Sequence, residues 1–249
     1  MTEALFIAEF SDPRVGDEIA LAGEEGRHAV AVRRIAVGET VLLADGSGTA
    51  VRGPVLSTDK VSLVMRVEDV LHTRVDEVRF VAAQALAKGD RAELAVEMLT
   101  EIGVDEVVPW QASRSIVKWV PDRAERQLSR WRSAAREATK QSRRFRVPVV
   151  TVPMSTRELA LRIPETALTL ILHESAELRI PFVELPDSGD VLIVIGPEGG
   201  IAPEELDALA AAGGIPVRIS DGVLRTSTAG VVALAQLHAV EQLKLRARG

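Results

Sequence analysis

Beyond residue 77 the chain alternates short apolar runs with stretches of helical periodicity, and this alternation limits the possible folds more than any other feature. Runs such as 190–196 are short and rich in β-branched residues, which predicts strands. Their alternation with helices favours a mostly parallel sheet, and hence an α/β fold. Strands are expected at 78–86, 104–110, 166–174, 190–196 and 215–220, and helices at 91–102, 122–142, 203–212 and 229–244, the last capped by Ser227 or Thr228.

The chain before residue 71 has a different character and reads as β-rich. Strands are expected at 5–10, 41–55 and 61–70, and one short helix at 28–34. The sequence Asp45-Gly46-Ser47-Gly48 is a turn signal between two strands. This pattern is typical of a small β-barrel, followed by a linker at 71–74. We therefore expect two domains, a barrel over 1–72 and an α/β domain over 73–249.

Composition narrows the class of protein further. Apolar residues make up 47% of the chain, and no apolar run approaches the about 18 residues that a membrane span needs. The N-terminal segment carries acidic residues where an export signal would be basic. Cysteine is absent, and the four histidines lack metal-ligand spacing. We expect a cytoplasmic protein with no membrane association and no structural metal.

Charge is distributed unevenly along the chain. Between Arg114 and Arg146 there are eleven Lys or Arg and three acids, so this segment carries +8 and the rest carries −14, given the net charge of −6. On a helical wheel of the long helix, apolar positions such as Leu128 and Trp131 gather on one side and the basic residues on the other. This pattern favours a localised anion-binding face, such as one for RNA. A merely solvated face is the alternative.

Three polar or glycine-rich loops follow three of the apolar strands, at 172–174, 196–200 and 220–225. In an open α/β sheet, ligands bind beyond the carboxyl ends of the strands, so these loops are expected to meet at one pocket. The loop at 196–200 reads GPEGG, which would let backbone approach a ligand closely. It matches neither the dinucleotide fingerprint nor the phosphate loop, and a simple tight turn is the competing interpretation.

These pieces together resemble one known family. IGPEGG at 195–200, the following Pro203-Glu204-Glu205 and DGVLRTSTA at 221–229 are similar to the C-terminal signature of the bacterial 16S rRNA uridine-N3 methyltransferases, members of the SPOUT superfamily. KGDR at 88–91, EIGV at 101–104, and Glu137-Ala138 leading to Gln141-Ser142 and Arg144 match as well. The resemblance implies an α/β SPOUT domain with a C-terminal trefoil knot, preceded by a PUA-like RNA-binding barrel.

The resemblance also implies a function and a set of site residues. The chain would bind S-adenosylmethionine and methylate N3 of a uridine in 16S rRNA, within the small ribosomal subunit, as a homodimer with a shared pocket. From its position directly after the third loop, Arg225 is the candidate to stabilise the charge that develops on the uracil, and Glu198 or water would take the proton. The implied cofactor-binding residues are Leu172, His173, Glu174, Ile195, Gly196, Gly199, Gly200, Ile219, Ser220, Val223 and Leu224. The basic segment at 114–146 and the KGDR match together give the candidate RNA-binding residues, which are Lys88, Arg91, Arg114, Arg136, Arg143 and Arg144.

One departure from the family and several alternatives stay open. The family usually has Glu where this chain has Ser227, so no acid–base role passes to that position. His173 is interpreted as a loop residue that packs on the cofactor, with a role as base as the alternative. Asp221 could be a turn former, and Arg225 could be a structural ion-pair partner. Rival functions are another SPOUT methyltransferase, acting on transfer RNA or a ribose hydroxyl, and a non-catalytic ribosome-assembly factor. A dinucleotide-dependent dehydrogenase is disfavoured because its fingerprint is absent.

Overall fold

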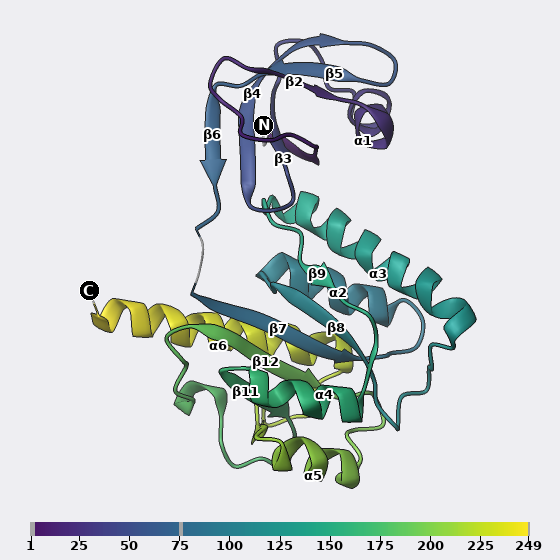
Figure 1. The fold of residues 1–249 in the computed structure, drawn as a ribbon, viewed down its shortest axis with the longest axis vertical. Coiled ribbons are helices and arrows are strands. Elements are labelled where there is room, and N and C mark those ends of the chain that lie inside the picture. Colours follow the sequence, from purple (N-terminus) through teal and green to yellow (C-terminus); the bar gives the residue numbers. More distant parts are fainter. Residues whose placement is uncertain (1–2, 75–76, 249) are drawn as a thin grey trace. The chain divides into compact units, whose positions relative to one another are not determined.

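The computed structural model describes residues 3–74 and 77–248, and its chain divides into two units with separate packed interiors. The first unit comprises Met1–Val75 together with Thr139–Val147, and the second comprises Asp76–Ala138 together with Pro148–Gly249. Their helices and strands are labelled in Figure 1. Within the described ranges, no helix is long and apolar enough to cross a membrane.

The first unit is built on a mostly antiparallel sheet. The strand order is β1-β3-β4-β5-β2, and β6 pairs with the remaining part of β4. The strands are β1 (Ala4–Ile7), β2 (Glu18–Leu21), β3 (Thr40–Ala44), β4 (Thr49–Thr58), β5 (Leu63–Arg66) and β6 (Asp69–His72). Val51, Gly53 and Val55 of β4 are buried while the residues between them are half-exposed, which is the alternation expected of a strand with one face on a core.

Local chemistry explains two features of this sheet. The predicted turn is confirmed: the Asp45 carboxylate accepts hydrogen bonds from the backbone N–H groups of Ser47, Gly48 and Thr49 at 2.7–3.0 Å. Gly53 allows a close crossing, because a Cβ there would lie 1.8 Å from the backbone oxygen of Arg66. Any side chain at that position would therefore push β4 away from the end of β5.

Two sequence predictions in the first unit need correction. The helix expected at 28–34 begins earlier, as α1 (Gly23–Arg27), and continues into one π-helical turn, η1 (His28–Val32). The linker expected at 71–74 is wrong in its first half, because Leu71 and His72 belong to β6. The β6 strand pairs with Thr49–Arg52 of β4. Without β6, the backbone N–H and C=O groups at that edge of β4 would lack hydrogen-bond partners.

The second unit contains a parallel sheet, which confirms the predicted α/β class. Its strand order is β10-β8-β7-β12-β11-β13, with β9 pairing beside β8. The strands are β7 (Val78–Ala85), β8 (Glu106–Gln111), β9 (Val149–Val150), β10 (Met154–Ser155), β11 (Leu168–Leu172), β12 (Gly189–Ile195) and β13 (Ile215–Val217). The last strand ends earlier than expected, since it stops at Val217 and not at residue 220.

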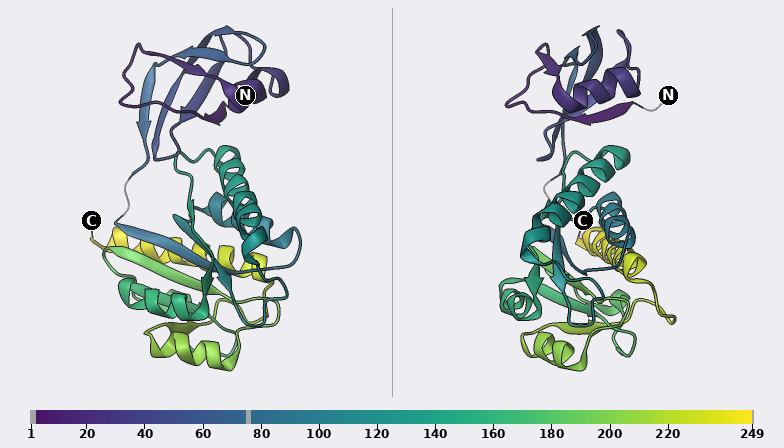
Figure 2. Two further views of the ribbon diagram at one scale, coloured as in Figure 1. Left: turned by 45° about the vertical axis from the view of Figure 1, so that its right-hand side comes forward. Right: turned by 90° about the vertical axis from the view of Figure 1, so that its right-hand side faces the viewer.

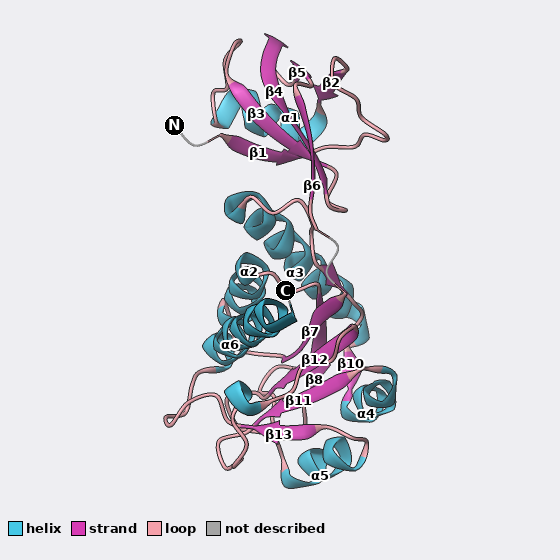
Figure 3. Ribbon diagram, turned by 90° about the vertical axis from the view of Figure 1, so that its left-hand side faces the viewer, coloured by secondary structure: helices cyan, strands magenta, loops and turns pink. Residues whose placement is uncertain are grey.

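Helices cover both faces of this sheet. They are α2 (Arg91–Ile102), α3 (Pro121–Ser142), α4 (Thr156–Arg162), α5 (Pro203–Ala211) and α6 (Thr226–Arg248), with short 3₁₀ turns η2 (Ile163–Glu165) and η3 (Ile180–Phe182). Helices α2 and α6 pack together on one face, and α4 and α5 lie on the other (Figures 2 and 3). The central strands β7 and β12 are consequently buried almost throughout, as their continuous apolar runs predict.

The last helix differs from the prediction in its start. It begins at Thr226 and not at residue 229, so Ser227 lies inside its first turn, 4% exposed, and is not a cap. The Arg225 carbonyl accepts hydrogen bonds from the N–H groups of Thr228 and Ala229, each at 2.9 Å, and these bonds extend the helix to Thr226. Further along, Gly230 lets the helix lie close to β12, because a Cβ there would be 2.9 Å from Ile195 Cδ1.

Helix α3 has the two-sided character that the wheel predicts. Leu128, Trp131 and Ala135 are buried, and the Trp131 ring packs edge-on against Trp119 at 5.3 Å between centroids. The basic side is less uniform than expected, because Lys140 forms a largely buried ion pair with Glu25 at 3.0 Å within the first unit. This lysine therefore serves the fold and not an exposed basic face.

Candidate active site

A pocket of about 80 Å³ lies where β11 and β13 end, within the second unit. The strands run parallel, with Leu172 opposite Val217, so the segments that follow them leave the sheet at the same edge. The pocket is lined by Leu172, His173, Glu174, Arg218, Ile219, Ser220, Gly222, Val223, Leu224 and Ala229. Two of the three loops expected to meet, 172–174 and 220–225, are thus brought together.

The loop after β13 is held by several contacts. The backbone oxygen of Ile219 accepts a hydrogen bond from the Gln236 amide of α6 at 3.0 Å. Asp221 forms an ion pair with Arg179, which ties the loop to the segment after β11. Val223 is 83% exposed although it is apolar. A branched apolar side chain held open beside a pocket can form a wall against a flat, apolar ligand group.

His173 and Glu174, which directly follow β11, also line the pocket. The His173 backbone N–H donates to Val217 O at 3.0 Å, and its Nδ1 accepts the N–H of Ser175 at 3.3 Å. The second contact holds the imidazole within its own loop. Glu174 is exposed, and no hydrogen-bond or ion-pair partner for its carboxylate lies among the described residues.

The GPEGG loop does not line this pocket. The Gly200 N–H donates to Pro197 O at 2.9 Å, and Gly200 has φ +72°, so the loop forms a tight turn. A Cβ on Gly199 would lie 3.2 Å from the Arg114 Cβ, and Arg114 Nη1 reaches Gly199 O at 3.4 Å. Valine at either glycine would therefore disturb the turn itself or its packing on Arg114. Loss of ligand binding in such variants would not place the loop at a ligand.

A buried hydrogen-bond relay nevertheless connects this loop to the pocket segment. Gln84, fully buried at the end of β7, donates from Nε2 to Thr226 Oγ1 at 2.9 Å. Thr226 Oγ1 in turn donates to Gly196 O at 2.8 Å. The first residue of α6 is thereby fixed to the first residue of the GPEGG loop. Because Arg225 directly precedes Thr226, the relay also fixes the backbone from which the Arg225 side chain extends.

The two candidate catalytic side chains are both exposed. Arg225 follows the pocket residue Leu224, and Glu198 sits at the tip of the Pro197–Gly200 turn. No ion-pair partner for either side chain lies among the described residues. The alternative interpretation of Arg225 as a structural ion-pair partner therefore gains no support. Asp221, another nearby carboxylate, is engaged by Arg179.

Glu205 of α5 is a buried carboxylate that organises the loops beside this edge of the sheet. It accepts hydrogen bonds from Ser113 N (2.9 Å), Ser113 Oγ (2.8 Å), Thr156 Oγ1 (2.5 Å) and Ala202 N (3.4 Å). Burial raises its pKa, but these donors outweigh burial and hold the pKa below its ordinary value. The charged carboxylate thus joins α5 to the residues after β8 and to the start of α4.

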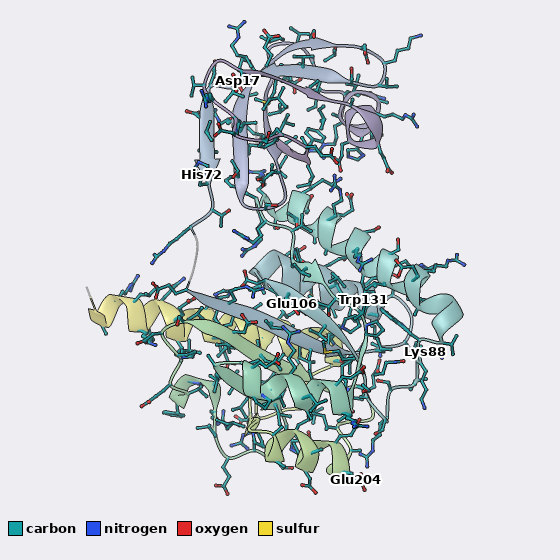
Figure 4. The ribbon with its side chains drawn as sticks, in the orientation of Figure 1. Asp17, His72, Lys88, Glu106, Trp131 and Glu204 are labelled. Atoms are coloured by element: carbon teal, nitrogen blue, oxygen red, sulfur yellow. The ribbon has the colours of Figure 1, made fainter. Side chains whose placement is uncertain are left out.

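The candidate RNA-binding residues are spread over both units. In the second unit Lys88, Arg91 and Arg114 are exposed, and Arg136 is half-buried. In the first unit Arg143 and Arg144 are exposed. Figure 4 shows Lys88 beyond the end of β7, whereas Glu106 lies near the beginning of β8. Lys88 therefore belongs to the edge of the sheet at which the pocket lies.

Sequence reasoning missed two pocket residues, Arg218 and Ala229, and included Gly222 only as part of the loop at 220–225. Arg218 had a signal that could have been used. It is a charged residue directly after the buried Val217, in an otherwise apolar run, and a charge in such a place needs a partner or a ligand.

Comparison with known proteins shows which family model and which relatives this chain matches. Residues 75–238 match the family model described as RNA methyltransferase domain. The chain is 43% identical over 228 residues to the ribosomal RNA small subunit methyltransferase E of Mycobacterium tuberculosis (strain CDC 1551 / Oshkosh), with 89% of this chain and 86% of the relative covered. It is 30% identical to the protein of that name from Bacillus subtilis (strain 168), with 88% of each chain covered.

A similar structure has also been solved with a ligand. The ribosomal RNA small subunit methyltransferase E from Neisseria gonorrhoeae, bound to S-adenosyl methionine, superimposes with a TM-score of 0.86 at 25% sequence identity. The superposition covers 96% of this chain and 98% of that chain, so the likeness extends over both units.

Proposed function

The chain belongs to the RNA methyltransferase domain family, and from this premise we propose that it transfers a methyl group from S-adenosylmethionine to small-subunit ribosomal RNA, at N3 of a specific uridine in 16S rRNA. The observation that supports S-adenosylmethionine as the cofactor is the pocket at the ends of β11 and β13. Two of the loops that the sequence resemblance identifies as cofactor-binding line this pocket. The 43% identity to a protein named for small-subunit ribosomal RNA supports the substrate.

The residues of the pocket fit S-adenosylmethionine. Ile219, Val223 and Leu224 offer apolar walls for an adenine ring, and the backbone around Gly222 is open enough for close approach. The cofactor supplies an activated methyl group on a sulfonium, so the chain's contribution is to hold donor and acceptor in line. Leu172–Glu174 and Ile219–Leu224 would bind it. The adjoining residues Ile195, Gly196, Gly199 and Gly200 belong to the same proposal, and Thr226 connects Gly196 to the pocket segment by a hydrogen bond.

The reaction at uridine N3 requires a proton to leave. As it leaves, negative charge spreads onto the uracil O2 and O4, and a fixed cation beside those oxygens stabilises the transition state. Arg225 takes this role in the proposal, because its backbone is fixed by the relay while its side chain is exposed next to the pocket. The proton passes to water or to Glu198, whose carboxylate stands on the neighbouring loop.

Several finer features belong to the same proposal. They are the trefoil knot in the second unit, the PUA-like character of the first, the assembled small subunit as the RNA context, the cytoplasmic location and a homodimer that shares the pocket. Support comes from the motif order along the chain and from the likeness over 96% of the chain to the Neisseria gonorrhoeae structure. The six-stranded sheet of the first unit, with its own core, fits a separate RNA-binding module.

Methyl transfer in a reconstituted reaction tests the proposal. The purified protein, S-adenosylmethionine labelled in its methyl group and small ribosomal subunits should give label in 16S rRNA, and mass spectrometry of nuclease fragments should place it on one uridine. Unlabelled RNA with demonstrable RNA binding would support the non-catalytic assembly factor instead. Label on transfer RNA or on a ribose hydroxyl would move the chain to another SPOUT activity.

RNA binding should depend on the exposed cations beside the pocket edge. Lys88 and Arg91 are exposed, and neither has an ion-pair partner among the described residues. If both contact phosphates, replacing them with Gln should lower the slope of log affinity against log salt by about 1.5, since each neutralised phosphate contributes about 0.7–0.9. Cofactor affinity should stay unchanged. Filter binding at several salt concentrations measures the slope, and an unaltered slope would assign both residues to a solvated surface.

A further inference from the structure

Arg218 is a cation in the pocket with no assigned task. It follows the last residue of β13, and its backbone N–H donates to Leu178 O at 2.8 Å, which fixes its Cα against the segment after β11. Its side chain lines the pocket. The Nε atom is buried, and no hydrogen-bond acceptor for it lies among the described residues.

The surroundings of Arg218 leave its charge without a counterion. Its neighbour across the short parallel bridge, Arg179, is paired with Asp221. No carboxylate among the described residues forms an ion pair with Arg218 itself. A buried N–H without an acceptor costs on the order of 1–3 kcal/mol, and more for a charged group. Such an arrangement in a pocket is typical of a residue whose partner is a ligand with a negative group.

The chemistry of the cofactor indicates which group that is. This step rests on the proposed function. S-adenosylmethionine has one anionic group, the carboxylate of its amino-acid end, beside a cationic ammonium and a cationic sulfonium. A guanidinium repels the two cations and binds a carboxylate through two parallel hydrogen bonds. Glu174, which also lines the pocket and has an exposed carboxylate, suits the ammonium.

We propose that Arg218 binds the carboxylate of the cofactor's amino-acid end, with Glu174 facing the ammonium. The adenosine part then lies against the apolar residues of the same pocket, Ile219, Val223 and Leu224. The zwitterionic end is thereby recognised by one positive and one negative side chain. Arg218 is a specificity residue for this cofactor and takes no part in the proton transfer.

The affinities for two ligands distinguish binding of the carboxylate by Arg218 from a general structural role of Arg218 in the pocket. S-adenosylmethionine and 5′-methylthioadenosine share the adenosine and the sulfur, but the second lacks the amino-acid end. Calorimetric titration of Arg218→Gln should show S-adenosylmethionine bound about 10- to 100-fold more weakly, the equivalent of one or two charged hydrogen bonds. The affinity for 5′-methylthioadenosine should stay within about twofold. Arg218→Lys, which keeps the charge, should recover part of the loss.

Controls make each outcome decisive. Arg157→Gln, an exposed arginine of α4 outside the pocket, should change neither affinity, and thermal melting of all variants reports folding. Equal weakening of both ligands in Arg218→Gln would make the arginine a support of the adenosine site and overturn the proposal. Unchanged affinities, or a loss confined to RNA binding, would overturn it as well. Failure of the unaltered protein to bind S-adenosylmethionine would instead reject the proposed function, and this inference with it.

Discussion

Arg225→Ala is expected to lower the single-turnover rate of methyl transfer by at least about 10²-fold, while the affinity for S-adenosylmethionine changes little. The interaction that the substitution removes exists mainly in the transition state, when charge has moved onto the uracil oxygens. Rapid mixing of the enzyme–cofactor complex with saturating RNA, followed by quenching, measures this rate directly and separates it from product release.

The backbone of Arg225 is fixed, whereas its side chain is exposed and has no ion-pair partner among the described residues. Thr226, the next residue, is 4% exposed and bonded on both sides, to Gln84 and to Gly196. Removing the Arg225 side chain should therefore leave the loop, the helix start and the pocket intact. Unchanged melting temperature and unchanged cofactor titration would verify that the loss is one of chemistry.

Two comparisons sharpen the result. Arg246→Ala removes an exposed arginine from the far end of the same helix and should leave the rate near that of the unaltered protein. Glu198→Gln should reduce the rate comparably to Arg225→Ala if Glu198 takes the proton, and much less if water does. A near-normal single-turnover rate for Arg225→Ala at saturating RNA would remove the arginine from the reaction.

Much of the second unit could be predicted from its pattern of apolar runs. Helix α2 was expected at 91–102 and has these bounds, because Gly103, with φ +100°, supplies the left-handed residue that ends a helix. The start of α6 could not be read in the same way. Ser227 and Thr228 were the predicted caps, but the helix begins at Thr226, whose hydroxyl donates to Gly196, thirty positions away in the chain. Local propensity does not contain such a contact.

The site was predictable only as far as sheet topology decides it. Parallel strands place the segments after β11 and β13 at one edge, which follows from the alternation of strands and helices. That the GPEGG loop folds as a turn packed on Arg114 depends on the residues after β8, distant in sequence. That Arg218 lacks a counterion could not be predicted for a similar reason, since it depends on the ion pair of Asp221 with Arg179.

The second large effect concerns folding. Glu205→Ala should destabilise the protein by on the order of 3 kcal/mol at neutral pH, because it leaves buried donors of Ser113 and Thr156 without their acceptor. Trp110 Nε1 also donates to Thr156 Oγ1, at 3.1 Å, so the disturbance extends into the core beneath α4. Chemical denaturation followed by tryptophan fluorescence measures the change in unfolding free energy.

The sign of the pH dependence follows from the lowered pKa of Glu205. A carboxyl whose pKa is lower in the folded than in the unfolded state stabilises the fold fully above the unfolded pKa, about 4.3 for glutamate. This stabilisation is lost as the pH falls through the folded value. The difference in unfolding free energy between the unaltered protein and Glu205→Ala should therefore be constant from neutral pH to about pH 5 and shrink below about pH 4.

The adjacent residue offers a matched control for this prediction. Glu204 occupies the same first turn of α5 but is exposed, as Figure 4 shows, and no partner for its carboxylate lies among the described residues. Glu204→Ala should change the unfolding free energy by no more than about 0.5 kcal/mol. Equal effects of the two substitutions would mean that charge near the helix N-terminus matters and the buried hydrogen bonds do not. A large effect of Glu205→Ala alone, shrinking in acid, would assign the stability to the bonds that Glu205 accepts from Ser113, Thr156 and Ala202.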